Sequence, residues 1–378
     1  MDTIFFVGLA ALAIIKAAPL VYGALCGLLG ERSGIVNIGI EGIMLLGAFM
    51  TFMGSALFQK WTGGIFSANL ALIIGLVVGI LSSGLVAALH ALLSINYKVN
   101  QVISGTVINL FAIGVTNYFA NVYIDPSHLA GVGVFPVIPI PLLSKIPILG
   151  QIFFSQQPLI YLMFILVLLL QYAIFHTPWG LRTRSVGEHP RAADTVGINV
   201  NQMRYINVII GGMIAGLGGA IMISDSIGRF QKLMIGGRGF IALAVLIFGR
   251  WTPLGALGAA LLFGFAEALG VRLQFGDVNQ ISALVVFIAL ILVLIAVYRI
   301  FQFLFKRQIE KKFISQTIIF GLIGVGLLLI TKWVEFPHVV IPIEFLGLLP
   351  YILTILVLAG FAGKAVAPSA LGKPYEKQ

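Results

Sequence analysis

Residues 158–176 read PLIYLMFILVLLLQYAIFH and contain no Asp, Glu, Lys or Arg. A helix needs ~20 consecutive, mostly apolar residues to cross the hydrocarbon core of a bilayer, so this run predicts a transmembrane helix. Ten further apolar runs flank it: 4–29, 35–58, 70–93, 99–121, 206–224, 239–250, 253–272, 280–298, 315–333 and 346–363. Because 239–250 is short and 4–29 contains Lys16 and Pro19, the sequence predicts an all-α, polytopic transmembrane helical bundle of about 9–11 spans.

The composition agrees with a membrane protein along the whole chain, 1–378, taken as a single transmembrane domain. Charged residues make up 10% and apolar residues 60%, with a mean hydropathy of +1.08. Soluble domains carry about 25% charged residues, which keep their folded surfaces dispersed. This composition excludes a soluble enzyme, a nucleic-acid-binding module and a disordered scaffold. The net charge of +10 needs no polyanionic partner, because cytoplasmic loops of membrane proteins are rich in Lys and Arg.

The distribution of basic residues orients the chain. With the N-terminus outside and alternating spans, 15 of the 23 Lys and Arg residues fall on the inner side. The long loop 122–157 is then outside, whereas the loop 177–205 and the basic turn 299–312 are inside. The excess of inner Lys and Arg predicts an outer N-terminus and a cytoplasmic C-terminus. The first residues lack a positive segment, so they are expected to begin the first span rather than a cleaved signal peptide.

Two Gly- and Arg-containing segments resemble each other, one in each half of the chain. They are Gly30–Gly39, GERSGIVNIG, and Gly236–Val245, GGRGFIALAV. Each precedes or begins an interrupted apolar run. Paired, Gly-interrupted segments in two halves are typical of transporters with inverted repeats. The similarity is short and predicts only a weak inverted-repeat character.

Glu41 is a carboxylate inside an apolar run, and Asn37 lies four residues earlier on the same helical face. A carboxylate at this depth is costly unless it faces water or polar partners. One interpretation is that Glu41 belongs to a polar substrate path or a gate. The other is that it has a structural role and binds backbone amides or Lys16.

Polar side chains also follow the run 99–121. They are Asn100, Gln101, Ser104, Thr106, Asn109, Thr116, Asn117 and Asn121. The spacing places Thr106, Asn109, Thr116 and Asn117 on one helical face. Neutral amides and hydroxyls suit an uncharged polar ligand such as a sugar or a nucleoside. Hydrogen bonds between helices are the alternative explanation.

The inner loop 177–205 contains the segment 187–200, GEHPRAADTVGINV. Pro190 suits the first turn of a helix and Gly197 suits the position after its end. The segment predicts a helix of about two turns at the cytoplasmic face. Such a solvated helix is expected to dock on a partner or to be an ordinary amphipathic loop helix.

Several kinds of chemistry have no sequence signature in this chain. There is no Gly-x-x-x-x-Gly-Lys-[Ser/Thr] phosphate loop and no Gly-x-Ser-x-Gly nucleophile elbow. Cys26 is the only cysteine, and the five histidines are scattered without metal-ligand spacing. We therefore expect no enzymatic activity, no ATPase site, no bound metal and no cofactor in this chain.

The stretch Ser33–Phe49, SGIVNIGIEGIMLLGAF, resembles the signature of bacterial nucleoside-type ABC permeases. These belong to the larger family of branched-chain amino acid and simple-sugar ABC permeases. Further segments agree with this resemblance: 100–109, 187–200, 237–253, 349–361 and 370–375.

The resemblance implies a permease subunit of an ABC importer in the bacterial plasma membrane. Its expected partners are a second homologous permease subunit, a cytoplasmic ATPase with two nucleotide-binding halves, a lipid-anchored substrate-binding protein and membrane lipid. ATP and Mg would be bound by the partner ATPase. The coupling helix that meets this ATPase would comprise Glu188, Pro190, Arg191, Ala192, Ala193 and Gly197. The substrate path would comprise Asn37, Glu41, Asn100, Gln101, Thr106, Asn109 and Asn117.

Nucleosides are the expected substrates, with a monosaccharide as the alternative and a branched-chain amino acid less favoured. A standalone secondary transporter is a further alternative, but ion-coupling carboxylates are scarce. Two features depart from the family pattern. Gln101 stands where the family has Glu, which removes a charge. Residues 275–340 look like an inserted helical hairpin, for which lipid or a partner subunit would be the contact.

Overall fold

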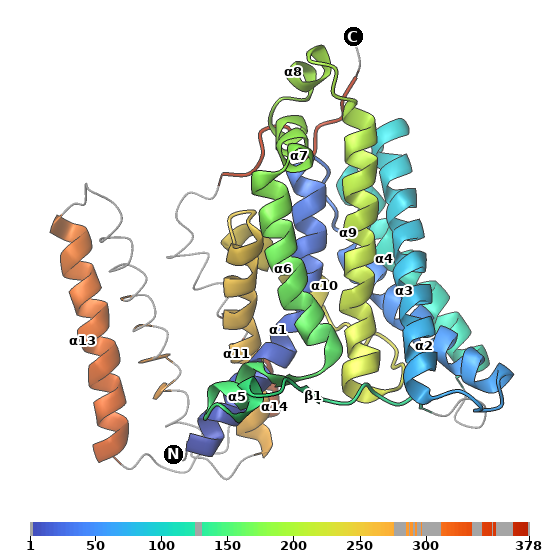
Figure 1. Ribbon diagram of the computed structural model, residues 1–378. Coiled ribbons are helices and arrows are strands. Elements are labelled where there is room, and N and C mark those ends of the chain that lie inside the picture. Colours follow the sequence, from blue (N-terminus) through green and yellow to red (C-terminus); the bar gives the residue numbers. More distant parts are fainter. Residues whose placement is uncertain are drawn as a thin grey trace. The chain divides into compact units, whose positions relative to one another are not determined.

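The computed structural model describes residues 3–124, 131–275, a few positions between 285 and 296, 311–334, 342–349, 351–352 and 366–376. Contacts divide the chain into two compact units. Unit 1 comprises Met1–Ala268 and Pro350–Gln378, and unit 2 comprises Leu269–Leu349. Within the described residues, seven helices are long and apolar enough to cross a membrane. The structure therefore confirms the prediction of an all-α, polytopic bundle (Figure 1).

Unit 1 begins with four long helices and the outer loop. The helices are α1 (Thr3–Arg32), α2 (Ile40–Trp61), α3 (Ala68–Ala91) with the π-helical turn η1 (Leu92–Asn96), and α4 (Gln101–Tyr123). The predicted outer loop contains β1 (Ile138–Pro139), η2 (Leu143–Lys145), α5 (Leu149–Phe153) and β2 (Ser155–Gln156). The two short strands pair antiparallel, with Ile138 opposite Gln156.

The second part of unit 1 contains α6 (Pro158–His176), α7 (Pro178–Glu188), α8 (Pro190–Thr195), α9 (Val200–Met222), the π-helical turn η3 (Ile223–Ile227) and α10 (Arg238–Phe248). The run 239–250, counted among the candidate spans, is the 11-residue helix α10 and is too short to cross a bilayer. The predicted inner loop 177–205 contains two short helices. The predicted one is α8, and α7 precedes it, with the Thr177 side chain accepting a hydrogen bond from Gly180 N at its start.

Helix α11 (Pro253–Phe275) begins in unit 1 and ends in unit 2. Unit 2 also contains α13 (Lys311–Trp333), which matches the predicted run 315–333, and α14 (Ile343–Gly347). The predicted runs 280–298 and 346–363 lie largely outside the described residues. The proposed insertion 275–340 overlaps unit 2, and its origin as an insertion stays a prediction.

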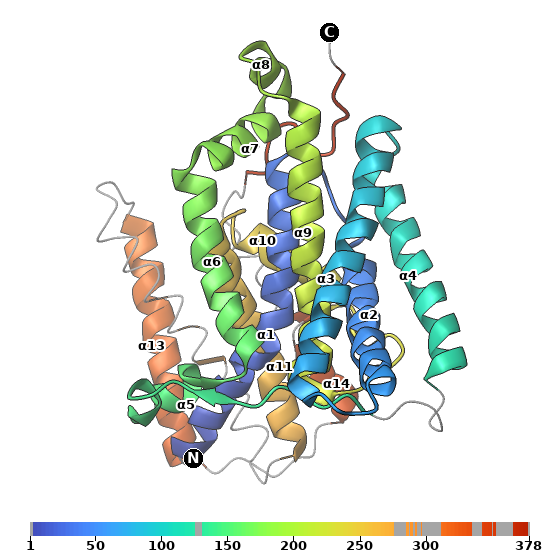
Figure 2. The ribbon, with the colours of Figure 1, turned by 45° about the vertical axis from the view of Figure 1, so that its right-hand side comes forward.

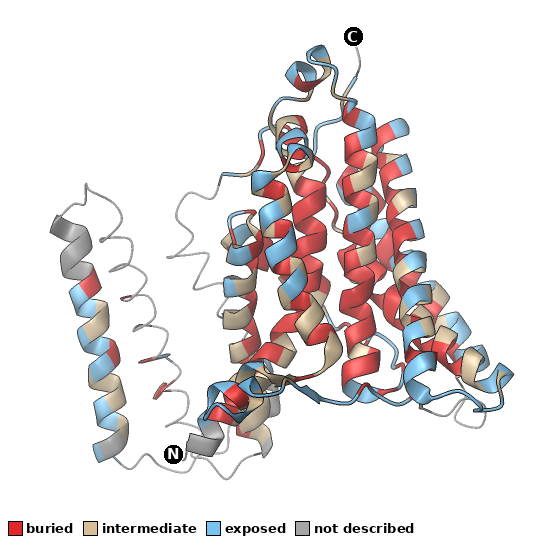
Figure 3. Ribbon diagram, in the orientation of Figure 1, coloured by how far each residue is buried: buried red, intermediate tan, exposed pale blue. Residues whose placement is uncertain are grey.

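The core of unit 1 consists of α1, α2 and α9, which are the most buried of the seven long helices, whereas α4 and α6 are the least buried (Figure 3). Small residues bring α9 against its neighbours. A Cβ added at Gly219 would lie 1.9 Å from the Met44 carbonyl oxygen, and one at Gly216 would lie 2.8 Å from the Ser83 Cβ. Such close backbone approach is the usual basis of helix packing in membranes.

The C-terminal residues 366–376, α7 and α8 lie at the end of unit 1 opposite the start of α1 (Figures 1 and 2). The ends of α1 and α3 reach the same place, since a Cβ at Gly187 would lie 2.1 Å from the Arg32 carbonyl oxygen and Lys98 pairs with Glu376. We call this place the α8 end. It gathers segments that the distribution of basic residues assigns to one side of the membrane.

Candidate functional site

Residues 33–39, which we call the α1–α2 break, run without helical structure between Arg32 and Ile40. Gly34 has φ +92°, a left-handed conformation that glycine adopts without strain. The break returns into the bundle, because Gly39 lies against Gly105 and Gly42 lies against Asn109, one to two turns inside α4. Irregular backbone at this depth requires protein partners for its amides and carbonyls.

Side chains from α4 supply part of these partners. Gln101 Oε1 accepts a hydrogen bond from Val36 N at 2.7 Å. Asn109 Nδ2 donates to Ile38 O at 3.0 Å, and Asn109 Oδ1 accepts from Gly42 N at 2.8 Å. The side-chain amides of Gln101 and Asn109 thus bind backbone groups that would bind one another if the helix were continuous.

Two buried basic side chains complete the support. His90 Nε2 lies 2.9 Å from Val36 O, and His90 Nδ1 lies 3.0 Å from Ser104 Oγ. A carbonyl only accepts, so Nε2 carries the proton. Arg204, which is 1% exposed, donates from Nε to Ser33 O at 3.1 Å. The break is consequently fixed by α3, α4 and α9 together.

Glu41 lies in the first turn of α2 and reaches the start of α10. Its Oε1 accepts from Gly237 N at 2.7 Å and its Oε2 accepts from Gly239 N at 2.6 Å. Amides at a helix start have no partner within the helix and carry partial positive charge. The Glu41 carboxylate, in the first turn of α2, therefore accepts hydrogen bonds from two free backbone N–H groups at the N-terminus of α10. Of the two interpretations of Glu41, this geometry supports binding to backbone amides.

Lys16, the other structural partner considered for Glu41, binds elsewhere. Its Nζ lies 3.4 Å from Glu267 Oε1, and Arg238 also pairs with Glu267. These three partly buried charges join α1, α10 and α11.

The far end of α10 returns to the α8 end. Arg32 donates from Nη2 to Trp251 O at 2.7 Å, and Trp251 Nε1 donates to Glu31 Oε2 at 2.5 Å. The two segments with similar sequences are thus linked through neighbouring residues, because Glu31 and Arg32 contact Trp251 and Glu41 contacts Gly237 and Gly239. Each leads to a helix that starts inside the bundle, and the starts of α2 and α10 meet at Glu41. This arrangement resembles the paired discontinuous helices of inverted-repeat transporters.

Helix α4 also presents an outward stripe, which consists of Thr106, Leu110, Gly114, Asn117 and Asn121 at helical spacing. Thr106 and Asn121 are exposed, and Leu110 is 65% exposed. Tyr118, 64% exposed, lies beside the stripe. Asn117 is half-buried, with its Oδ1 buried and unpaired among the described residues, and Asn121 Oδ1 accepts a hydrogen bond from Lys232 Nζ. The stripe therefore combines hydroxyl and amide groups, and one cation beside them, with an aromatic ring.

The structure separates the predicted path residues into two groups. Asn37, Glu41, Gln101 and Asn109 bind the backbone of the break, of α2 or of α10, and Asn100 caps α4 by accepting from Val102 N and Ile103 N. Thr106 and Asn117 belong to the outward stripe. The predicted common face of Thr106, Asn109, Thr116 and Asn117 is divided accordingly, because Asn109 and Thr116 point into the protein and are buried.

The predicted coupling residues also fall into two groups, one exposed and one packed against unit 1. Arg191, Ala192 and Gly197 are exposed, and Val196 between them is 74% exposed. Ala193 is buried in a small apolar cluster with Val186, Val200, Met203 and the ring of Tyr375. Pro190 is half-buried at the first position of α8, and Glu188 binds Ser369. Helix α8 thus has one free face and one face fixed to unit 1.

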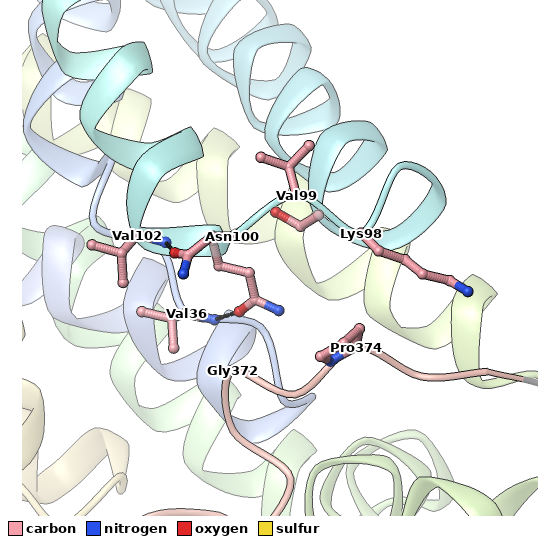
Figure 4. A pocket seen from close by; sticks show the side chains of 9 residues that line it. Val36, Lys98, Val99, Asn100, Val102, Gly372 and Pro374 are labelled. Carbon is pink, nitrogen blue, oxygen red and sulfur yellow. Dashed lines mark hydrogen bonds between the residues drawn. The ribbon is translucent and has the colours of Figure 1, made fainter.

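A cavity of about 330 Å³ lies at the α8 end (Figure 4). Val36 of the break forms one side, Lys98 to Val102 form another, and Gly372 and Pro374 close it. Within the described residues, no group of three or more His, Cys, Asp or Glu side chains could hold a metal ion.

Sequence reasoning did not identify His90, Arg204 and Trp251 as functional residues, or the contacts of residues 369–376. A His and an Arg inside long apolar runs were the available signals, because such groups need partners in a membrane protein. Their partners are backbone carbonyls distant in sequence, which no local pattern reveals.

Comparisons with known proteins place the chain among transport permeases. Residues 9–296 match the family described as branched-chain amino acid transport system / permease component. The chain is 38% identical over 369 residues to the guanosine ABC transporter permease protein NupQ of Bacillus subtilis, covering 96% of this chain and 95% of the relative.

Two further relatives differ in the substrate that their names give. The nucleoside ABC transporter permease protein NupC of Lactococcus lactis is 34% identical, covering 96% of this chain and 95% of the relative. The putative glucose ABC transporter permease protein TsgC13 of Haloferax volcanii is 35% identical, covering 71% of this chain and 79% of the relative. No solved structure matches the chain.

Proposed function

The chain belongs to the family of branched-chain amino acid transport system permease components, and from this premise we propose that it is the membrane-spanning subunit of an ABC importer for nucleosides. The similarity to two nucleoside permeases along 96% of the chain supports this substrate. The observation in the structure that carries the transport role is the exposed helix α8, which is fixed to a bundle of apolar helices by its inner face.

Helix α8 is the proposed docking point for a cytoplasmic ATPase. Its free face presents Arg191 and Ala192 to solvent, and Val196, the residue that caps the C-terminal end of α8, is also exposed. Arginine is enriched at protein interfaces, and in this proposal the docked ATPase would cover Arg191 and Val196. ATP and Mg would be bound by the two nucleotide-binding halves of the partner, because this chain has no phosphate-binding loop.

The outward stripe of α4 is the proposed wall of the substrate path, facing a second homologous permease subunit. Thr106 and Asn121 are exposed and offer hydrogen-bonding groups, with Lys232 bound to Asn121, and Asn117 is half-buried between them. Tyr118 offers a ring that can stack on a base. Nucleosides are uncharged, with hydroxyls on one part and a flat base on the other. The half-buried Glu41 and the buried Gln101 and Asn109 would act indirectly, by holding the helices that move.

In this proposal the α8 end faces the cytoplasm of a bacterial cell, so the start of α1 is outside the plasma membrane and the C-terminus is inside. The excess of basic residues at the inner loops supports this orientation. A lipid-anchored binding protein would deliver the nucleoside at the opposite end.

The test is uptake by cells or vesicles that contain this chain with its ATPase, second permease and binding protein. Radiolabelled guanosine should accumulate only when ATP is hydrolysed, and unlabelled nucleosides should compete while glucose does not. Competition by glucose alone would favour the monosaccharide, which the similarity to a putative glucose permease keeps as the second candidate. Uptake by the lone chain without an ATPase would contradict the importer and favour a secondary transporter.

A further inference from the structure

The C-terminal residues 369–376, which we call the strap, cross the α8 end and bind α7 first. Ala370 N donates to Gly187 O at 2.9 Å. Ser369 donates from Oγ to Glu188 Oε2 at 2.9 Å, and Ser369 N lies 3.1 Å from the same oxygen. The strap is therefore joined to the residues that directly precede α8.

The strap then binds the α1–α2 break. Gly372 N donates to Gly34 O at 3.0 Å. Arg204 donates from Nη1 to Lys373 O at 3.3 Å while its Nε donates to Ser33 O. A single buried guanidinium thus holds the strap and the break together, and both are anchored to α9.

The last strap residues contact α8 and the α3–α4 connection. The Tyr375 ring packs against the cluster of Val186, Ala193, Val200 and Met203. Partial burial, and then the nearby Asp194 carboxylate, raise the pKa of the Tyr375 hydroxyl. Lys98 Nζ lies 2.6 Å from Glu376 Oε1, and this cation lowers the pKa of Glu376.

The strap also bounds the cavity at this end. Gly372 and Pro374 line it together with Val36, which Figure 4 shows near them, and with Gln101. The buried Ser94 Oγ has no hydrogen-bond partner among the described residues, although Ser94 lines the cavity. The open volume leaves room for the strap and the break to shift without first displacing packed side chains.

We propose that the strap transmits movement of α8 to the α1–α2 break. This inference rests on the proposed function, in which α8 meets the ATPase. The break sets where α2 begins, and Glu41 in the first turn of α2 holds the start of α10. A displacement of α8 would then pass through Tyr375 and Ser369 to Gly34, and from there to both helices that begin inside the bundle. The direct packing of Gly187 against Arg32 forms a second, rigid link beside it.

The test uses the complete importer in lipid vesicles and measures ATP hydrolysed per nucleoside imported. Tyr375→Ala removes the ring from α8 and is expected to raise this ratio several-fold while the complex still assembles, since Tyr375 is only partly buried. Tyr375→Phe keeps the ring and loses only the hydroxyl beside Asp194, so its ratio should lie much nearer to that of the wild type than to that of Tyr375→Ala. Val366→Ala, an exposed position before the strap, is the matched control and should not change it.

A second variant first breaks the contact between the strap and Glu188 and then restores it chemically. Glu188→Cys with Ser369→Cys replaces two side chains in contact, and the only native thiol, Cys26, is buried. The reduced double variant should hydrolyse more ATP per nucleoside, and bridging the two thiols with a short bifunctional reagent should return the ratio toward wild type.

Wild-type ratios in Tyr375→Ala and in the reduced double variant would overturn the role of the strap. Arg191→Glu on the free face of α8 separates this outcome from failure of the proposed function. If Arg191→Glu abolishes nucleoside-stimulated hydrolysis while the strap variants behave as wild type, only the strap inference is wrong. If Arg191→Glu also leaves stimulation unchanged, the docking role of α8 is wrong.

Discussion

Gly239 N donates a hydrogen bond to Glu41 Oε2 at 2.6 Å, and a Cβ added at Gly239 would lie 2.5 Å from the Glu41 Cα. The starts of α2 and α10 therefore touch through their backbones as well as through the carboxylate. Positive partial charges gather where helix N-termini meet, and the negative charge of Glu41 offsets them. This contact joins the two halves of unit 1 at the point where both discontinuous helices begin.

Replacing Glu41 tests whether its role is structural. Glu41→Ala leaves the amides of Gly237 and Gly239 without acceptors, and an unpaired buried amide such as that of Gly239 costs about 1–3 kcal/mol. Glu41→Gln should be milder, because one amide oxygen still accepts. We expect a lower melting temperature of the purified complex and, in the protein that remains folded, a nearly unchanged KM for nucleoside uptake. Normal thermal stability with a strongly raised KM would instead indicate direct substrate contact.

Gly239→Ala tests the close approach itself. The added methyl cannot fit 2.5 Å from Glu41 Cα, so α10 must move away and the carboxylate must lose Gly239 N. Gly258→Ala in α11 is the matched control, because no described atom lies within 4 Å of its Cβ position and alanine favours helix by about 1 kcal/mol. Thermal unfolding followed by size-exclusion chromatography should show a destabilised Gly239→Ala and an unaffected or stabilised Gly258→Ala. Equal stability of the two variants would exclude the packed contact.

Most helices of this fold could be predicted from local sequence. An apolar run in a membrane has no water to bind, so it satisfies its backbone N–H and C=O groups by forming a helix. The run 158–176 corresponds to α6 residue for residue. Helix α10 shows the limit of this reasoning. Its residues are as apolar as those of a span, but it begins inside the bundle, where Glu41 replaces the missing preceding turn.

The candidate site was only partly predictable for a related reason. Asn109 and Thr106 are both polar residues of one helix, and helical spacing alone does not show which of them faces the protein. Asn109 points inward because Ile38 and Gly42 need partners, and this need arises only once the break is folded. The strap was not predictable from pattern, since Arg204 and Lys373 are 169 positions apart.

The outward stripe of α4 yields a prediction for the substrate path. Thr106→Val removes an exposed hydrogen-bonding group, and Asn117→Leu removes a half-buried amide whose Oδ1 has no partner among the described residues, so folding should be unaffected. Nucleoside uptake by the assembled importer should fall several-fold. Asn109→Leu is the contrasting variant, because it removes the partners of Ile38 O and Gly42 N and should lower the amount of folded protein. If Thr106→Val and Asn117→Leu leave the uptake per folded complex unchanged, the substrate path does not include this stripe.

The free face of α8 yields the last prediction. Val196 is 74% exposed and would be buried against the ATPase, so Val196→Asp places an unpaired charge in that interface. Val366→Asp is the matched control, since Val366 is 83% exposed and lies outside α8. The ATPase should co-purify with the wild type and with Val366→Asp but be lost from Val196→Asp, while all three chains insert into the membrane equally. Ala193→Asp should behave differently from Val196→Asp, because Ala193 is buried against Tyr375 and the charge would detach α8 from unit 1. Retention of the ATPase by Val196→Asp would show that the interface does not include this face of α8.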